Sequence, residues 1–282
     1  MAGTLYLVAT PIGNLEDMTY RAVRILQEVD LIAAEDTRNS LKLLNHFEIK
    51  TPMTSYHEHN KYEKAEELVK KLAEGMDIAV ITDAGTPGIS DPGEELVRQS
   101  YEAGITVVPV PGACAAVNAL VASGLPTRRF SFEAFLPTDK KERRAVFEEL
   151  KTDTRTIVIY EAPHRLRKTL AELSQELGDR DATVCRELTK KHEEFFRTTL
   201  CQAASYYSEH EPKGECIIVI RGISREILEA EAKKSWEDMD IADHIRMYMS
   251  QGMDKKEATR QVAKDRGIPK RDVYEFAKEL PH

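Results

Sequence analysis

The chain has 282 residues, of which 41% are hydrophobic and 31% are charged, and its formal net charge is −8. This length is enough for two domains, and the negative charge argues against a protein that binds polyanions over its whole surface, although a local basic patch remains compatible with it. No apolar run reaches the length of a membrane span. No basic residues precede the apolar residues of the N-terminal segment, so we do not expect a signal peptide there.

The four cysteines are Cys114, Cys185, Cys201 and Cys216. They form no CxxC pair, and no histidines cluster at the spacing of metal ligands, so we expect no metal site. Free cysteines without a pairing pattern are typical of a reducing compartment. We therefore expect a cytoplasmic protein.

The first part of the chain alternates strand and helix patterns. Apolar runs that predict strands occupy residues 4–10, 30–36, 52–57, 77–84 and 105–110. Segments with helical periodicity lie between them, at residues 19–29, 39–47 and 62–75 and again before the last strand, with Thr19 as a candidate N-cap. This order predicts a mostly parallel sheet with helices on both faces.

A second α/β segment follows. Its expected strands are residues 130–135, 154–160, 181–188, 193–199 and 214–222. The fourth of these follows the third too closely for a crossover helix, which predicts an antiparallel pair.

From residue 225 the pattern becomes helical. Residues 225–240 are charged and indicate a helical linker, and the segment beyond Asp240 predicts short helices interrupted at Gly267 and Pro269. That arrangement is typical of a helix-turn-helix, and a small helical cap is the alternative. We expect three parts: an N-terminal α/β domain (1–112), a C-terminal α/β domain (113–224) and a helical extension (225–282).

Loops rich in Gly and Pro follow four strands of the first segment. They read ATPIGNLED, AAEDTR, DAGTPGISDPG and PVPGACAA. Because the carboxyl ends of parallel strands share one edge of a sheet, the four loops should open on the same side and form a ligand site. No GxGxxG, P-loop or nucleophile elbow is present. The pattern favours a cofactor that is held mainly by backbone and apolar contacts.

Polar residues near these loops are candidates for substrate chemistry. Glu35, Asp36 and Arg38 follow the second strand, and His57 follows the third. The alternative for the first three is an ordinary helix cap with first-turn charges. The run EAPHR places Glu161, His164 and Arg165 after a strand of the second segment, where Pro163 is suited to begin a helix.

Basic residues cluster after Pro137 and again near residues 165–168 and 190–191. The first cluster, DKKERR, predicts a mobile cationic loop that contains Lys140, Lys141, Arg143 and Arg144. Each cluster alone is typical of a solvated surface. Around one cleft, the clusters would contact phosphates.

As a set, six of these segments resemble the ribosomal RNA small subunit methyltransferase I family: ATPIGNL, AAEDTR, DAGTPGISDPG, PVPGACAA, YEAPHR and KGE. The resemblance covers about residues 4–222, and the helical tail is similar to that family's C-terminal extension. The family, a branch of the tetrapyrrole methylase superfamily, transfers a methyl group from S-adenosylmethionine to the ribose 2′-oxygen of a cytidine in small-subunit (16S) ribosomal RNA. The resemblance implies two αβα domains with the cofactor in a cleft between them, usually a homodimer, and ribosomal RNA or an assembled small subunit as the partner.

The resemblance also implies a set of cofactor contacts. The superfamily's Gly-Asp-Pro loop corresponds to residues 85–87, its Pro-Gly-x-(Ser/Thr)-Ala turn to residues 111–115, and its residue after the strand tyrosine to Glu161. The implied cofactor-binding residues are Pro11, Ile12, Ala84, Gly85, Thr86, Ile89, Cys114, Ala115 and Glu161. Thr86 replaces the aspartate of the tetrapyrrole branch, which argues against a porphyrinoid substrate and agrees with RNA.

Methyl transfer to a ribose hydroxyl needs alignment of three atoms and a proton acceptor. Glu35 or Asp36 is our first hypothesis for the acceptor and His57 the second, while Arg38 could hold a phosphate. The expected substrate-binding residues are Arg38, Lys140, Lys141, Arg143, Arg144, His164 and Arg165. Two alternatives remain open: a related methyltransferase that acts on a tetrapyrrole or a protein, and a non-catalytic RNA-binding module.

Overall fold

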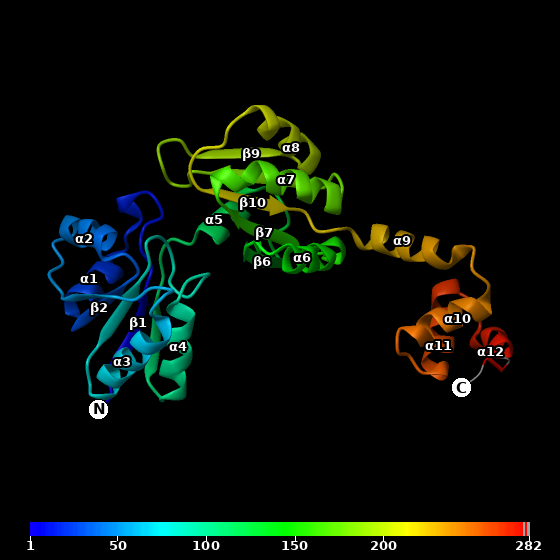
Figure 1. Cartoon of the computed structure of the whole chain (residues 1–282), viewed down its shortest axis with the longest axis horizontal. Helices are drawn as coiled ribbons and strands as arrows, with labels where there is room; N and C mark the ends of the chain where they lie inside the picture. Colours follow the sequence, from blue (N-terminus) through cyan, green and yellow to red (C-terminus); the bar gives the residue numbers. More distant parts are fainter. Residues whose placement is uncertain (279, 281–282) are drawn as a thin grey trace. The chain divides into compact units, whose positions relative to one another are not determined.

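The structure is a computed structural model that describes residues 1–278 and 280, without the side chains of residues 231, 232, 235 and 237. Two compact units make up the chain: residues 1–222 form the first, and the second begins at Ile223 (Figure 1). The first unit contains two five-stranded sheets, and the second is helical. The end of the expected extension, residues 279, 281 and 282, lies outside the described residues.

The first sheet is wholly parallel, as the sequence predicts. Its strands are β1 (Thr4–Val8), β2 (Leu31–Ala34), β3 (Met53–Ser55), β4 (Ile78–Ile81) and β5 (Thr106–Val110), in the order β3-β2-β4-β1-β5. Its helices are η1 (Leu15–Asp17, a 3-10 turn), α1 (Tyr20–Glu28), α2 (Thr37–His46), α3 (Lys61–Ala73) and α4 (Gly93–Glu102). This parallel arrangement brings the carboxyl ends of all five strands to one edge.

Both faces of this sheet are covered because its strand residues alternate between two cores. Val8 and Ile32 face a core with Leu26 of α1 and Leu44 of α2. Leu5, Leu31 and Val80 face the opposite core, with Leu68 of α3 and Leu96 of α4. Burial on both faces explains the nearly continuous apolar runs of the strands.

The helix α2 begins two residues earlier than its periodicity predicts. The Asp36 carboxylate accepts a hydrogen bond from the backbone N–H of Arg38 (2.8 Å), which makes Asp36 the N-cap. Strand β2 consequently ends at Ala34, and Glu35 and Asp36 lie in the connection. Thr19 caps α1 as predicted, by accepting from the N–H of Ala22.

The second sheet is mixed. Its strands are β6 (Phe130–Phe135), β7 (Thr156–Glu161), β8 (Asp181–Arg186), β9 (Glu194–Thr199) and β10 (Cys216–Ile220), in the order β6-β7-β10-β8-β9. Only β6 and β7 are parallel, and the predicted antiparallel pair of β8 and β9 is confirmed. One face packs on α5 (Ala115–Ala122), and the other packs on α6 (Lys140–Thr152), α7 (Pro163–Leu177) and α8 (Leu200–Glu209).

The prediction of a mobile loop at residues 139–144 is wrong. Asp139 is an N-cap whose carboxylate accepts from the N–H groups of Lys141 and Glu142 (2.9 and 3.0 Å), so these residues are the first turn of α6. Six consecutive charged residues made the amphipathic pattern of this helix hard to recognise, although Arg143 occupies a buried position on it.

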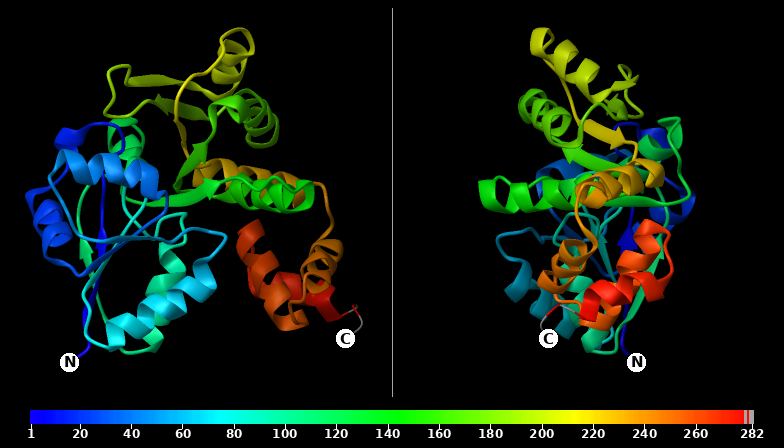
Figure 2. Two further views of the ribbon diagram at one scale, coloured as in Figure 1. Left: turned by 60° about the vertical axis from the view of Figure 1, so that its left-hand side comes forward. Right: turned by 90° about the vertical axis from the view of Figure 1, so that its right-hand side faces the viewer.

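The second unit consists of α9 (Arg225–Glu237), α10 (Ile241–Ser250), α11 (Lys255–Arg266) and α12 (Lys270–Lys278). The last three helices form a bundle (Figure 2). Its core contains Ile245, Val262 and Val273. Gly267 ends α11 in the left-handed conformation, with φ of 62°, and only Ile268 and Pro269 separate it from α12. The predicted pair of short helices is thus confirmed. Among the described residues, every helix is too short or too polar to cross a bilayer.

Candidate functional site

Three of the four Gly- and Pro-rich loops bond to one another at the carboxyl edge of the first sheet. Thr10, in the loop after β1, and Gly85, in the loop after β4, exchange two backbone hydrogen bonds of 2.9 and 3.1 Å. The hydroxyl of Thr86 donates to the carbonyl oxygen of Ala113, in the loop after β5 (2.9 Å). These three loops therefore open on one side, as the sequence predicts.

The loop after β4 needs glycine for a steric reason at Gly85. Its φ is +85°, and a Cβ there would lie 3.3 Å from Cγ2 of Ile12 and 3.5 Å from the carbonyl oxygen of Ala113. The far end of the loop is held by Asp91, whose carboxylate accepts from the N–H groups of Gly88, Ile89 and Gly93 at 2.7–3.0 Å. The loop is therefore fixed at both ends by bonds that leave its middle open to a ligand.

A cavity of about 380 Å³ lies among these loops and the near ends of β7 and β10. Eight of the nine predicted cofactor residues line it: Ile12, Ala84, Gly85, Thr86, Ile89, Cys114, Ala115 and Glu161. The ninth, Pro11, lines an adjoining cavity of similar volume that shares Ile12 and Ala84. The structure thus brings the predicted set together, while the role of each residue toward a ligand stays a prediction.

Sequence reasoning missed most of the opposite wall of this cavity. Phe135 of β6, Tyr160 of β7, and Cys216 and Ile217 of β10 line it, with Glu215 just before β10. The sequence signals for this wall were two motifs: YEAPHR, which begins at Tyr160, and KGE, which ends at Glu215.

The tyrosine of this wall is held firmly. The rings of Tyr160 and Phe135 lie 5.8 Å apart, and the Tyr160 hydroxyl accepts from the N–H of Ala116 (3.0 Å). Burial, and next the nearby Cys114, raise the pKa of Tyr160 to about 12. At neutral pH, Tyr160 is therefore a neutral aromatic surface that faces the cavity.

Five carboxylates line the cavity. Glu161 pairs with Arg165 and Glu215 with Lys190. Glu35, Asp83 and Asp91 give the remaining wall a negative potential. Burial raises the pKa of Glu35, and the negative charges of Asp83, Asp91 and Glu58 raise it further. A carboxylate that resists ionisation beside other acids marks a place where a positively charged ligand is stabilised.

The predicted proton acceptors occupy different environments. Glu35 lines the cavity, whereas the Asp36 carboxylate is engaged in capping α2, and the N–H group of Arg38 holds the Asp36 pKa below its usual range. His57 lies outside the residues that line the cavity, and its Nδ1 is buried without a hydrogen-bond partner among the described residues. Glu35 is consequently the candidate that the geometry favours.

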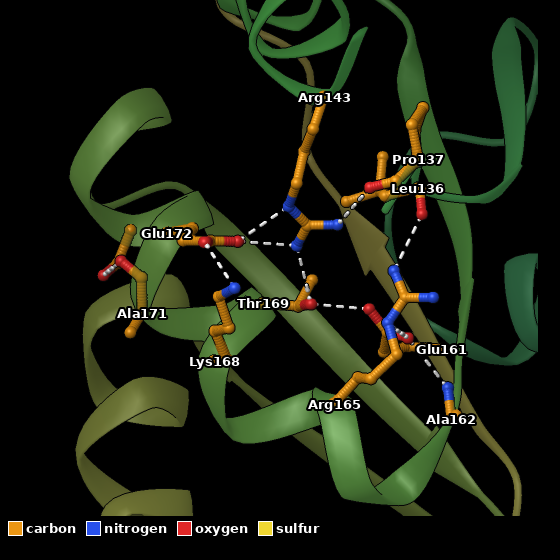
Figure 3. A network of polar contacts seen from close by, with 11 residues as sticks. Leu136, Pro137, Arg143, Glu161, Ala162, Arg165, Lys168, Thr169, Ala171 and Glu172 are labelled. Atoms are coloured by element: carbon orange, nitrogen blue, oxygen red, sulfur yellow. Dashed lines mark hydrogen bonds and ion pairs between the residues drawn. The ribbon is translucent and has the colours of Figure 1, made fainter. Parts of the chain in front are cut away.

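Two of the predicted substrate-binding cations are enclosed in a polar network behind the cavity (Figure 3). Arg143, which is 8% exposed, donates to Glu172 Oε2 and to the hydroxyl of Thr169 (both 2.8 Å). Thr169 in turn donates to Glu161 Oε2 (2.5 Å). Arg165 donates to the carbonyl oxygen of Leu136 (2.7 Å) and lies 3.2 Å from Glu161 Oε1.

This network connects α6 and α7 to the end of β7. The Glu161 carboxylate is turned into it and also accepts from the N–H of Ala162 (2.9 Å). The other five predicted substrate-binding residues are exposed: Arg38, Lys140, Lys141, Arg144 and His164. None of the seven predicted substrate residues lines the cavity.

The family model of the tetrapyrrole (corrin/porphyrin) methylases matches residues 4–204. The protein named ribosomal RNA small subunit methyltransferase I of Halalkalibacterium halodurans is 52% identical over 96% of this chain and 93% of its own length. A protein of the same name from Synechocystis is 51% identical over 99% of this chain and 98% of its own length. Another, from Bacillus subtilis, is 48% identical over 97% of this chain and 93% of its own length.

Solved structures share the fold at lower identity. A uroporphyrin-III C-methyltransferase from Thermus thermophilus superposes with a TM-score of 0.55 and 21% identity, over 77% of this chain and 94% of its own. A diphthine synthase superposes with a TM-score of 0.63 and 13% identity, over 78% of this chain and 90% of its own. These likenesses support the fold of the two sheets.

Proposed function

Because the chain belongs to the ribosomal RNA small subunit methyltransferase I family of the tetrapyrrole methylases, we propose that it methylates small-subunit ribosomal RNA, with S-adenosylmethionine as the donor and the 2′-oxygen of a cytidine ribose as the acceptor. The single observation that carries the proposal is the loop-lined cavity with Glu35, Asp83 and Asp91 at its wall. Its shape and its charge each suit this donor.

The shape favours a ligand held by backbone groups. Thr86 and Gly85 present main chain at the cavity wall, and a side chain at position 85 would meet Ile12. Ile12, Ile89 and Ile217 supply apolar contacts for a flat ring. These features suit a nucleoside ligand, which needs no phosphate-binding loop in the protein.

The charge favours a cation. S-adenosylmethionine supplies a methyl carbon on a positively charged sulfur. Glu35, Asp83 and Asp91 are placed to stabilise positive charge at the cavity. The pKa of Glu35 is raised first by burial and then by the negative charges of Asp83 and Asp91.

Within this proposal, Glu35 is the proton acceptor. A ribose hydroxyl is a weak nucleophile at neutral pH, so a carboxylate within hydrogen-bond reach helps by taking its proton as the oxygen–carbon bond forms and the carbon–sulfur bond breaks. Glu35 directly follows β2 and lines the cavity, and its pKa is higher than that of a free glutamate. It therefore lies within reach of a bound substrate and is better suited to accept a proton. The loops after β1, β4 and β5 hold the reacting groups in line.

We also propose a cytoplasmic homodimer that acts on ribosomal RNA or on the assembled small subunit. Arg38, Lys140, Lys141, Arg144 and His164 are exposed and can donate to phosphates, whereas the internal bonds of Arg143 and Arg165 give those two residues a structural role.

The test is transfer of labelled methyl groups. The protein is incubated with S-adenosylmethionine labelled in the methyl group and with small subunits that lack the modification, and protein-free small-subunit RNA is treated in parallel. We expect label in one cytidine, at a linkage that resists alkaline hydrolysis because its 2′-oxygen is blocked. Label on a base, on a ribosomal protein or on an added tetrapyrrole would contradict the proposal.

A further inference from the structure

The second unit contains a groove that the proposed chemistry does not use. It has a volume of about 1150 Å³ and lies where the end of α10 and the start of α11 meet α12. Twelve residues line it, and six of them are basic: Lys255, Lys256, Arg260, Lys270, Arg271 and Lys278. In a chain with a net charge of −8, this is a pronounced local separation of charge.

The one acid in the groove wall does not neutralise these cations. The Asp254 carboxylate caps α11 by accepting from the N–H of Glu257 (2.7 Å). Lys256, Arg260 and Lys270 are exposed, and among the described residues no carboxylate pairs with them. Three cations are therefore free to bind an anion from outside the unit.

The groove also presents an aromatic ring. The side chain of Tyr274 is 58% exposed, and Nζ of Lys278 lies 5.5 Å from the centre of its ring. Met249, Met253 and Ala277 supply apolar surface beside it. A basic groove with an exposed aromatic side chain is the arrangement by which proteins bind a nucleic-acid backbone and stack on an unpaired base.

The groove is built on rigid elements. Ala258, Val262 and Val273 are buried in the core that joins α10, α11 and α12, so the basic residues project from helices with fixed spacing. Lys270 begins α12 directly after the short turn at residues 267–269. This helix-turn-helix geometry holds cations from two helices along one hollow.

We propose that this groove is an RNA-docking site, in which Lys256, Arg260 and Lys270 contact phosphates and Tyr274 stacks on an unpaired base. The inference rests on the proposed action on RNA and adds a second place at which that RNA is held. A concave groove with one exposed ring suits a strand of nucleic acid better than it suits a flat anionic membrane.

The experiment measures the affinity of the full-length chain for transcribed small-subunit ribosomal RNA over a range of salt concentrations. The groove variant carries Lys256→Ala, Arg260→Ala and Lys270→Ala. Loss of three phosphate contacts should weaken binding on the order of tenfold or more and reduce the slope of log affinity against log salt by about 2 to 3. Tyr274→Ala should weaken binding about fivefold to a hundredfold with little change of slope, and Tyr274→Phe should restore it.

A matched control removes the same charge elsewhere in the unit. Arg225→Ala, Lys234→Ala and Lys264→Ala alter three exposed basic residues outside the groove. The proposal is overturned if this control loses as much affinity as the groove variant, because the effect then reflects net charge alone. It is also overturned if the groove variant keeps its RNA affinity, or if it loses affinity only for phosphatidylglycerol vesicles.

The measurement separates this inference from the proposed function. RNA affinity is determined without a methyl donor, so it tests the groove even if the chain transfers no methyl group. Binding of S-adenosylmethionine by the groove variant, followed as a rise in melting temperature, should equal that of the unaltered protein, which shows that the proposed donor site is intact. An unchanged circular dichroism spectrum in the far ultraviolet shows that the helices of the second unit are still formed.

Discussion

The hydroxyl of Thr86 donates a 2.9 Å hydrogen bond to the backbone carbonyl of Ala113, 27 residues further along the chain. This bond joins the loop after β4 to the loop after β5, and both loops line the cavity. Thr86 thus sets the distance between two walls of the proposed donor site.

Replacement of Thr86 by Val should widen this site. Valine keeps the shape of threonine but leaves the part-buried Ala113 carbonyl without its donor, which costs about 0.5–1.5 kcal/mol. Affinity for S-adenosylmethionine, measured by calorimetric titration, should fall roughly twofold to tenfold. Thr86→Ser keeps the hydroxyl and should retain the affinity. Equal losses in the two variants would show that the hydroxyl does not matter.

Gly85→Ala should affect both stability and donor binding. The φ of +85° disfavours any Cβ by about 1–2 kcal/mol, and this Cβ would also press on Ile12 at the cavity. Gly104→Ala is the matched control, since Gly104 has φ of +70° but open space around it and lies outside the cavity. Both variants should unfold at lower denaturant concentration, and only Gly85→Ala should bind the donor more weakly. A normal donor affinity for Gly85→Ala contradicts the assignment of this loop.

The half of the site that the loops of the first sheet form could be predicted from the sequence, because the loops after parallel strands meet at one edge of a sheet. Once strands 4–8, 31–34 and 78–81 are recognised as parallel neighbours, the loops after them must meet at one edge. The opposite wall obeys no such rule. Phe135 and Cys216 reach the cavity only through the packing of the second sheet against the first-sheet loops, which no periodicity encodes.

Arg143 illustrates a second limit. In the run DKKERR it looks like every other cation, and its burial depends on Glu172 and Thr169, which lie 29 and 26 residues away on α7. An amphipathic pattern could have identified the inward face of α6 through Phe147 and Leu150, which are buried on the same helix. The partners of the Arg143 guanidinium could not be predicted in this way, because only tertiary packing brings α7 beside α6.

Glu35→Gln should reduce turnover and donor affinity together and should weaken the pH dependence of donor binding. Burial raises the pKa of Glu35, so as pH falls from about 7 toward the ordinary glutamate value of about 4.3 this side chain takes up its proton early. The cationic donor binds the ionised form better, so affinity should decrease with falling pH in the unaltered protein and decrease less in Glu35→Gln. Calorimetric titrations across this range measure the difference.

The control for Glu35 is Asp36→Asn, because asparagine can still cap α2. If Glu35 is the proton acceptor, Asp36→Asn should keep most of the turnover. Loss of turnover in Asp36→Asn with full activity in Glu35→Gln would move the role to the neighbouring carboxylate.

Thr169→Val should destabilise the first unit, because Thr169 is the central link of the network in Figure 3. Its hydroxyl accepts from Arg143 and donates to Glu161, and the side chain is 1% exposed. Valine would leave both charged groups short of a buried partner, at a cost on the order of 1–3 kcal/mol in the free energy of unfolding. Thr152→Val, on the exposed side of α6, should change that free energy by less than about 0.5 kcal/mol. Denaturant titrations measure the free energy of unfolding of both variants. A lower value for Thr169→Val than for Thr152→Val, restored by Thr169→Ser, assigns the stabilisation to the Thr169 hydroxyl. Equal values would mean that Thr169 does not hold the network together.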